Sequence, residues 1–188
     1  MDLTATSSRR NFIKAGSALS AGMLFVPKLV FAAKPAIIAK HEKRIRLFNP
    51  NTGDHFNEVF WAEGKFIPEA LEGFDYILRD RYTNEVTEIN RKLIGLFHTL
   101  QDKFASKQPF NVFCGYRSEK TNKQYRARKR GVARHSRHLT GDAIDFNIPN
   151  VQLRDLKKAA IELKAGGVGY YPRSGFIHMD IRNKTAQW

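Results

Sequence analysis

The sequence predicts an α+β fold in a single domain, and three observations support this prediction. Apolar residues recur at spacings of three and four in some segments and alternate with polar residues in others, so both helices and strands are expected. The two kinds of segment mingle without the regular alternation of a βαβ array. A length of 188 residues with 42% hydrophobic residues suffices for one core and excludes general disorder. We expect a small, mostly antiparallel sheet packed against helices.

Two strands and two helices are predicted in the first half of the folded segment. The strands are Arg44–Asn49 and His55–Trp61, joined by a turn rich in Asn, Pro and Gly. A helix opens at Pro68, because proline suits the first helical position. A longer helix spans about Asn90–Ser106, where apolar residues recur at helical spacing over the whole length. This segment is the strongest candidate for a core helix.

The second half is predicted to combine four strands with two helices. Ser118 is a suitable N-cap for a polar helix that extends to about Arg130. The other elements follow from alternation for the strands and from helical spacing for one amphipathic helix. These elements are strands at Phe110–Cys114, Asp142–Ile148, Val168–Tyr171 and Phe176–Ile181, and a helix at Leu153–Leu163.

The first 32 residues have the order of a twin-arginine export signal. Two adjacent arginines, Arg9 and Arg10, precede an uncharged run of twelve residues from Ala15 to Val26. This run is too short to cross a bilayer, which takes about 20 residues, but it has the length of a signal-peptide core. Small residues at the −3 and −1 positions favour cleavage after Ala32. The alternative is an ordinary amphipathic helix that contains Arg-Arg by chance.

This signal predicts the organisation and the location of the protein. We expect a signal peptide at residues 1–32, a flexible leader at 33–43 and one catalytic or binding domain at 44–188. The twin-arginine translocase would be a transient partner and would deliver the folded chain to the periplasm. After cleavage the chain would keep no stable membrane anchor.

The chain is strongly basic, and the charge belongs mainly to the expected domain. The sequence holds 32 Lys and Arg against 18 Asp and Glu, a formal charge of +14. Removal of residues 1–32 takes away four basic residues and one acidic residue, which leaves +11. Because export argues against nucleic acid as a partner, the charge indicates anionic polymers of the cell envelope.

Two histidines and an aspartate form a candidate metal site. His138 and Asp145 lie seven residues apart across a glycine turn, and His178 lies in a late predicted strand. Two imidazoles and one carboxylate leave a fourth tetrahedral position for water, as in a catalytic zinc site. The single cysteine, Cys114, excludes a Cys-based structural zinc site and is expected to be buried and inert. The alternative treats the three residues as separate polar groups on exposed strand faces.

Two segments carry a resemblance to a known family. The segment from Ser136 to Asp145 reads Ser-x-His-x-x-Gly-x-Ala-x-Asp. Followed by His178, this pattern resembles the motif of the D-alanyl-D-alanine zinc peptidases, which share the hedgehog/DD-peptidase fold. Residues 115–118, Gly-Tyr-Arg-Ser, are similar to the family's turn that carries an active-site arginine. The similarity extends over most of residues 44–188.

The resemblance implies a zinc peptidase that hydrolyses peptide cross-links of peptidoglycan with a metal-activated water. By position, His138, Asp145 and His178 would bind one zinc ion per chain. Arg117 would steady the scissile carbonyl or the developing oxyanion, unless it forms a surface ion pair. The resemblance points to 3–3 links between two diaminopimelate residues, whose stem peptides are anionic.

The residue that accepts the proton from water is the open point of this assignment. Many members of the family carry a Glu three residues, or a His two residues, before the last ligand, where this chain has Gly175 and Phe176. Asp180 shares a strand face with His178 and is the leading candidate, although it could instead orient His178. His135 is a second candidate.

Three other functions remain open at this stage. A carboxypeptidase acting on D,D or L,D ends of stem peptides would use the same site. A peptidoglycan-binding module without catalysis would explain the missing Glu or His. A basic protein that binds nucleic acid would require the N-terminus to mimic a signal. A related question is whether the basic run from Arg126 to Arg137 lines the cleft or forms a solvated helix face.

Overall fold

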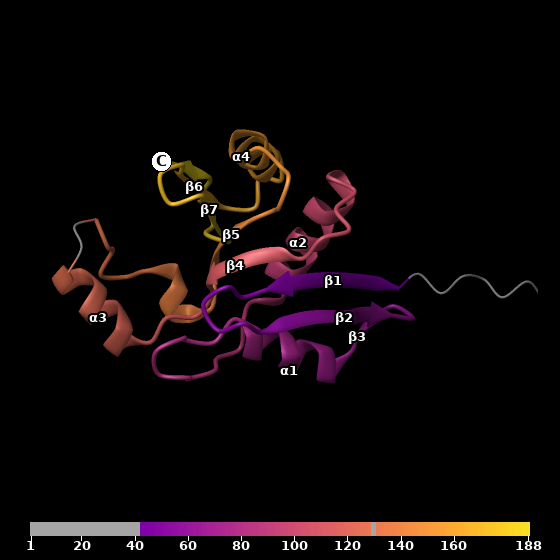
Figure 1. The fold of residues 1–188 in the computed structure, drawn as a ribbon, viewed down its shortest axis with the longest axis horizontal. Helices are drawn as coiled ribbons and strands as arrows, with labels where there is room; N and C mark the ends of the chain where they lie inside the picture. The colour runs from indigo at the N-terminus through magenta and orange to yellow at the C-terminus, as the bar shows by residue number, and fades with distance from the viewer. Residues whose placement is uncertain (1–41, 129–130) are drawn as a thin grey trace, which may run out of the picture. The chain divides into compact units, whose positions relative to one another are not determined.

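The computed structural model describes residues 42–128 and 131–188 (Figure 1). The predicted signal peptide at 1–32 lies outside the described residues, as does most of the predicted leader. The first strand begins at Lys43, one residue before the predicted domain start at Arg44. No helix in the two described ranges is long and apolar enough to cross a membrane.

An eight-stranded sheet runs through this part of the chain (Figure 1). Its strand order is β3-β2-β1-β4-β5-β7-β6-β8. The strands are β1 (Lys43–Phe48), β2 (His55–Ala62), β3 (Lys65–Phe66), β4 (Phe110–Cys114), β5 (Ala143–Asn147), β6 (Gly167–Tyr171), β7 (Phe176–Asp180) and β8 (Ala186–Gln187).

The fold is α+β, as the sequence predicts, but the sheet differs from the small, mostly antiparallel one that was expected. It is mixed, because the β1–β4 and β6–β8 pairs are parallel while the other neighbours are antiparallel. It is also larger by β3 and β8, which have two residues each. So short a strand shows no alternation of polar and apolar residues, so the sequence pattern does not reveal it.

Four helices and one 3₁₀ turn, η1, complete the described part. Pro68 is the first residue of α1, and the Asn90 side chain caps α2 by accepting from the backbone N–H of Lys92. The Ser118 hydroxyl accepts from the backbone N–H of Thr121 in α3, at 3.2 Å. The bounds are α1 (Pro68–Ile77), α2 (Arg91–Lys103), α3 (Glu119–Arg128), η1 (Arg137–Thr140) and α4 (Leu153–Glu162).

The centre of the core lies between α2 and the middle strands. The Phe97 ring of α2 lies 5.5 Å from that of Phe110 on β4 and 4.4 Å from that of Phe146 on β5, between centroids. Leu93 and Leu100 on the same helix are fully buried. The prediction that α2 is a core helix is therefore confirmed. This packing fixes β4 and β5, the strands from which the candidate site is built.

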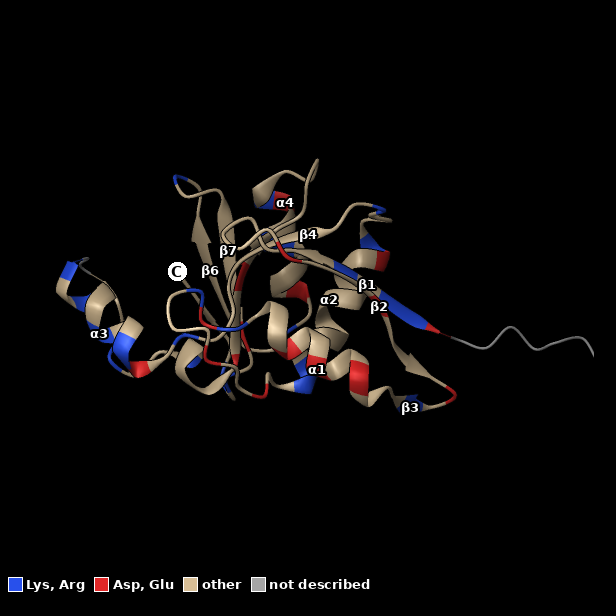
Figure 2. Cartoon of the chain, turned by 60° about the horizontal axis from the view of Figure 1, so that its bottom comes forward, with Lys and Arg blue, Asp and Glu red and all other residues tan. Residues whose placement is uncertain are grey.

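The polar helix α3 is the exception among the helices. Its buried residues are Thr121 and Asn122, and basic residues lie along much of its length (Figure 2). It projects from the sheet rather than covering it (Figure 1). A helix with so small an apolar contribution adds little to the core. Its position leaves it available to contribute side chains to a functional site.

Candidate metal and peptidase site

Neighbouring strands bring two predicted ligands together. β5 pairs antiparallel with β7, and Asp145 lies opposite His178 in the register. On the other side of β5, Cys114 of β4 lies opposite Asp145. Side chains at paired positions share a face of the sheet, so the three residues form a row across it. The hypothesis that the Asp145 and His178 strands are neighbours is confirmed.

His138 reaches the same place from η1, immediately before β5. The Ser136 hydroxyl accepts from the backbone N–H of His138 at 3.4 Å, and Gly141 ends the turn with a φ of 69°. A Cβ at Gly141 would lie 2.6 Å from the carbonyl oxygen of Glu88. The Ser and the Gly of the sequence motif therefore have structural roles, because they shape the turn that presents His138.

Hydrogen-bond partners indicate which ring nitrogen of each histidine carries the proton. His138 Nδ1 lies 2.7 Å from the carbonyl oxygen of Gly115, which can only accept, so the proton is assigned to Nδ1. His178 Nε2 lies 3.1 Å from Asp180 Oδ2, so its proton is assigned to Nε2. The remaining nitrogens, His138 Nε2 and His178 Nδ1, each present a lone pair.

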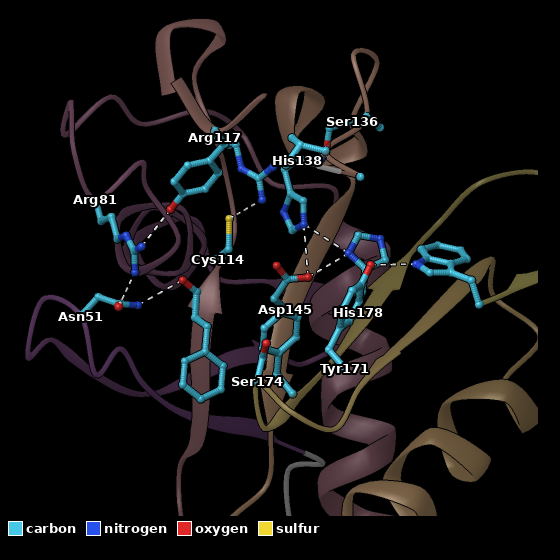
Figure 3. A pocket seen from close by; sticks show the side chains of 17 residues that line it. Asn51, Arg81, Cys114, Arg117, Ser136, His138, Asp145, Tyr171, Ser174 and His178 are labelled. Carbon is cyan, nitrogen blue, oxygen red and sulfur yellow. Dashed lines mark hydrogen bonds and ion pairs between the residues drawn. The ribbon is translucent and has the colours of Figure 1, made fainter. Parts of the chain in front are cut away.

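These two lone pairs converge with a carboxylate oxygen (Figure 3). His138 Nε2 lies 3.2 Å from His178 Nδ1, and Asp145 Oδ1 lies 3.2 Å from the first nitrogen and 2.8 Å from the second. With both ring protons engaged elsewhere, three acceptors face one another, and a cation between them would relieve their repulsion. Ligands of a tetrahedral zinc ion with bonds of about 2.1 Å lie about 3.4 Å apart. The donor set and its spacing therefore fit zinc.

Burial strengthens the demand for positive charge. His138, Asp145 and His178 are each no more than 8% exposed. Burial opposes the charge on His138, but the charges of Cys114 and Asp145 hold its pKa well above the usual value. Burial would also raise the pKa of Asp145, yet the two histidines hold it below its usual range. The cluster thus attracts a positive charge, whether a proton or a metal ion supplies it.

Asp180 is fully buried behind His178. Its carboxylate accepts from the backbone N–H of Gly167 at 2.9 Å and from the Arg182 guanidinium, in addition to the His178 ring. Burial would raise the pKa of Asp180, but the hydrogen bonds from His178 and Arg182 hold it below its usual range. A carboxylate with both oxygens engaged is a poor proton acceptor and a good support for an imidazole.

Arg117 lies beside this cluster, in the loop between β4 and α3. Its guanidinium donates to Asn122 Oδ1 at 3.3 Å and to Cys114 Sγ at 3.5 Å, and it lies 4.9 Å from the Tyr125 ring centroid. Its Nε is buried without a hydrogen-bond partner. Within residues 42–128 and 131–188 it forms no ion pair with a carboxylate, so the alternative of a surface ion pair does not describe it.

A cavity of about 710 Å³ opens over the cluster (Figure 3). Cys114 lines it, with its Sγ within 4.8 Å of ligand atoms of His138 and Asp145. The expectation that Cys114 is buried is therefore wrong: it is half-buried, because the β4 strand ends at the cavity wall. Sequence reasoning also missed several lining residues from distant segments, for which no spacing gave a signal. These residues are Asn51, Arg81, Tyr125 and Trp188.

Trp188 forms one wall of the cavity. Its ring lies 5.4 Å from the His178 ring, and its Nε1 donates to the Tyr171 hydroxyl at 2.8 Å. A Cβ on Gly169 would lie 2.7 Å from the Trp188 indole, so this glycine leaves the space that the indole needs. Gly169, inside β6, therefore serves packing at the site.

A second cavity, of about 300 Å³, shares part of this wall. His135 lines it together with His178 and Asp180. Of the basic run from Arg126 to Arg137, Arg137 borders this second cavity, whereas Arg126 is exposed. The run thus borders the site at one end and forms a solvated surface along α3.

Comparisons with known proteins identify relatives of the chain. The family model described as peptidoglycan L,D-endopeptidase MepK, a peptidase family of the M15 group, matches residues 37–188. The peptidoglycan L,D-endopeptidase MepK of Escherichia coli (strain K12) is 35% identical over 180 residues, which cover 96% of each chain.

A second relative gives the same result. The probable peptidoglycan L,D-endopeptidase MepK of Haemophilus influenzae is 37% identical over 175 residues, which cover 92% of this chain and 91% of the relative. No solved structure is significantly similar to the chain. The family model covers most of the chain, and both relatives cover nearly all of it. The chain therefore belongs to the MepK family of M15 peptidases.

Proposed function

We propose that the chain is a zinc-dependent peptidoglycan endopeptidase that hydrolyses 3–3 cross-links between two diaminopimelate residues. The observation that carries this proposal is the convergence of three lone pairs in a cavity with room for a peptide (Figure 3). The bond type rests on the relatives, whose names state L,D-endopeptidase. A 3–3 link joins the L-centre of one diaminopimelate to the D-centre of the next, so it is an L,D amide.

In the proposed site His138, Asp145 and His178 hold one zinc ion. Zinc would lower the pKa of a bound water and polarise the scissile carbonyl. The chain would keep both ligating nitrogens deprotonated and would orient both imidazole rings towards the metal. The carbonyl of Gly115 does this for His138, and the carboxylate of Asp180 does it for His178.

We assign to Arg117 the stabilisation of negative charge on the scissile carbonyl oxygen. It lines the cavity beside the ligands, and its charge is not neutralised by a carboxylate ion pair within the described ranges. A guanidinium that is held in place before the reaction stabilises developing charge without reorganisation. Its contacts with Cys114 and Asn122 hold it in this way.

We assign the proton transfer to His135 and an orienting role to Asp180. Asp180 has both oxygens engaged in hydrogen bonds, whereas His135 is exposed and lines the cavity that it shares with His178. His135→Gln is expected to lower kcat by about 10²- to 10⁴-fold while the metal content stays unchanged. An unchanged kcat in this variant would exclude His135 from proton transfer.

The proposed place of action is the periplasm, after export through the twin-arginine pathway. This part rests on the sequence of residues 1–32 and on the substrate in the relatives' names. Replacement of Arg9 and Arg10 by lysine is expected to leave the uncleaved precursor in the cytoplasm. Cleavage and export that continue unchanged in this variant would argue for another route.

The decisive experiment is mass spectrometry of muropeptides that contain 3–3 cross-linked dimers, digested by the purified protein with and without a chelator. We expect dimers to become monomers, the chelator to stop the reaction and added zinc to restore it. Release of single terminal residues would indicate a carboxypeptidase. Binding to sacculi without released fragments would indicate a non-catalytic module. Cleavage by protein that contains no metal would contradict the zinc assignment.

A further inference from the structure

Arg81 is a cation in the same cavity that the proposed chemistry does not use. It is half-buried in the loop after α1 and lines the cavity together with Arg117. Its Nη2 donates to the hydroxyls of Tyr82 and Tyr125, each at 2.8 Å, and its Nη1 donates to Asn51 Oδ1. All three partners are neutral oxygens, so none of them balances the charge of the guanidinium.

Two arginines close to Arg81 in the sequence are paired with acids. Arg79 pairs with Asp54 at 2.7 Å, and Arg91 pairs with Asp75 at 2.6 Å. Among the residues that the structure describes, no carboxylate lies within ion-pair distance of Arg81. A charge-assisted hydrogen bond to a carboxylate is about twice as strong as a neutral one, and the guanidinium fork fits a carboxylate in two-point contact. An anionic ligand would therefore compete well with the present neutral partners.

The surroundings of Arg81 hold it in place before any ligand arrives. The Tyr125 hydroxyl accepts from Arg81, and the ring of Tyr125 lies 4.9 Å from the Arg117 guanidinium. The Asn51 amide nitrogen donates to the carbonyl oxygen of Phe113 at 3.1 Å, which fixes its oxygen towards Arg81. Tyr125 thus connects the two arginines of the cavity.

The buried carboxylate of Asp80 connects the loop of Arg81 to the loop of Arg117 by hydrogen bonds. Asp80 is 1% exposed and accepts from the backbone N–H of Tyr82 and of Ser118, each at 2.8 Å. These two N–H groups follow Arg81 and Arg117 in the sequence. Because the arrangement is formed in advance, a ligand would not have to order the two loops when it binds.

Arg81 lies at the opposite side of the cavity from the metal ligands. In Figure 3, Arg81 and Asn51 are separated from His138 and His178 by Cys114. We propose that Arg81, held by Tyr125 and Asn51, is a subsite for a free carboxylate of the stem peptide. The proposal takes its substrate from the proposed function, in which diaminopimelate carries a carboxylate close to the bond that is cut. The subsite would fix the direction in which the stem lies across the metal ligands.

The test compares a carboxylate with its amide in binding to the purified protein. The probes are the stem tripeptide alanyl-γ-glutamyl-diaminopimelate and the same peptide amidated at the D-centre carboxylate, measured by calorimetry. We expect the unmodified protein to bind the acid about 10- to 100-fold more tightly than the amide. Arg81→Gln is expected to bring the ratio of the two affinities, acid to amide, close to 1, because only the binding of the acid is weakened. Arg81→Lys should retain part of the preference, because it keeps the charge but loses the fork.

Two further variants keep this test decisive. Arg154 is an exposed arginine of α4 outside the cavity, and Arg154→Gln should leave the acid-to-amide ratio unchanged. Tyr125→Phe removes the hydroxyl that holds Arg81, retains the ring and should lower the ratio by several-fold. An acid-to-amide affinity ratio that is unchanged in Arg81→Gln would contradict the subsite. So would an unmodified protein that binds the acid and the amide equally well.

Cleavage of a 3–3 cross-linked dimer is measured in parallel, so that the two proposals fail separately. A carboxylate preference that depends on Arg81 in a protein that does not cleave would contradict the proposed function and support the subsite. Cleavage by a protein without any carboxylate preference would support the proposed function and contradict the subsite. Circular dichroism of each variant verifies that the fold is retained.

Discussion

The two sides of the cavity are built in different ways. On one side His138, Asp145 and His178 are buried and are held by the register of adjacent strands and by one short turn. On the other side Arg81 is half-buried in a loop and is held by the side chains of Asn51 and Tyr125. A backbone register specifies position with little tolerance, whereas loops accept changes more easily. The comparison indicates a metal side that is fixed by the backbone and a recognition side that is fixed by side-chain contacts.

The largest effect is expected from breaking the metal side. His138→Ala removes one of three ligands, so the metal content should fall far below one ion per chain. Because a bound metal contributes several kcal/mol of transition-state stabilisation, cleavage should fall by at least about 10³-fold. Elemental analysis and a cleavage assay measure these effects. His55→Ala, at an exposed histidine of β2, is the control and should retain both properties. Full metal content in His138→Ala would refute the ligand assignment.

The second prediction tests whether Arg117 stabilises the transition state beside the metal ligands or binds the substrate together with Arg81. Arg117→Gln is expected to lower kcat by about 10²- to 10³-fold with little change in KM, because the lost interaction is made in the transition state. Arg117→Lys should recover part of the rate, and metal content should be normal in both variants. A raised KM with an unchanged kcat would instead place Arg117 with Arg81 on the recognition side.

The third effect separates two roles of Asp180. Asp180→Asn weakens the support of His178, and metal affinity should fall by about 10- to 100-fold in a competition titration with a chromophoric chelator. At saturating zinc the kcat should be nearly normal. Asp155→Asn, which alters an exposed pair with Arg154 on α4 outside the cavity, is the control. A large loss of kcat with unchanged affinity would identify Asp180 as the general base.

The smallest effect on cleavage is expected from Asp80, although it lowers stability. Burial would raise the pKa of Asp80, but hydrogen bonds from Thr121, Tyr82 and Ser118 hold it below the ordinary value of 3.8. Its stabilising contribution is therefore present above about pH 3.8 and is lost as the pH falls through the lower folded-state value. Asp80→Asn should lower the free energy of unfolding by about 1–3 kcal/mol at neutral pH, measured by denaturant titration. The difference from the unmodified protein should shrink below about pH 4, and a constant difference would contradict this account.

The same contrast explains what the sequence could predict. His138 and Asp145 lie in one compact motif, and a strand period of two places His178 and Asp180 on one face. That Asp145 and His178 meet depends on the pairing of β5 with β7, which the structure shows. The recognition side gave no such signal, because Arg81, Asn51 and Tyr125 meet only in the folded chain. The sequence also left the role of Asp180 open, since a strand period gives its face but not its hydrogen-bond partners.

The secondary structure shows the same limit. The helices α1 and α2 and the longer strands were predicted because each has a clear apolar period. The short strand β8 was not, because two residues carry no period, although β8 is what brings Trp188 to the cavity. The direction of pairing in a mixed sheet depends on how the chain crosses between strands. Local patterns contain no information on that crossing.

Trp188 gives the protein an internal fluorescent reporter. The chain has two tryptophans, and the other, Trp61, lies on β2 away from the cavity. With its indole 5.4 Å from the His178 ring, Trp188 is close enough for its emission to be quenched when Cu²⁺ or Co²⁺ occupies the ligands. A Trp61→Phe background would leave one emitter, so that loading and removal of the metal could be followed optically without any added label.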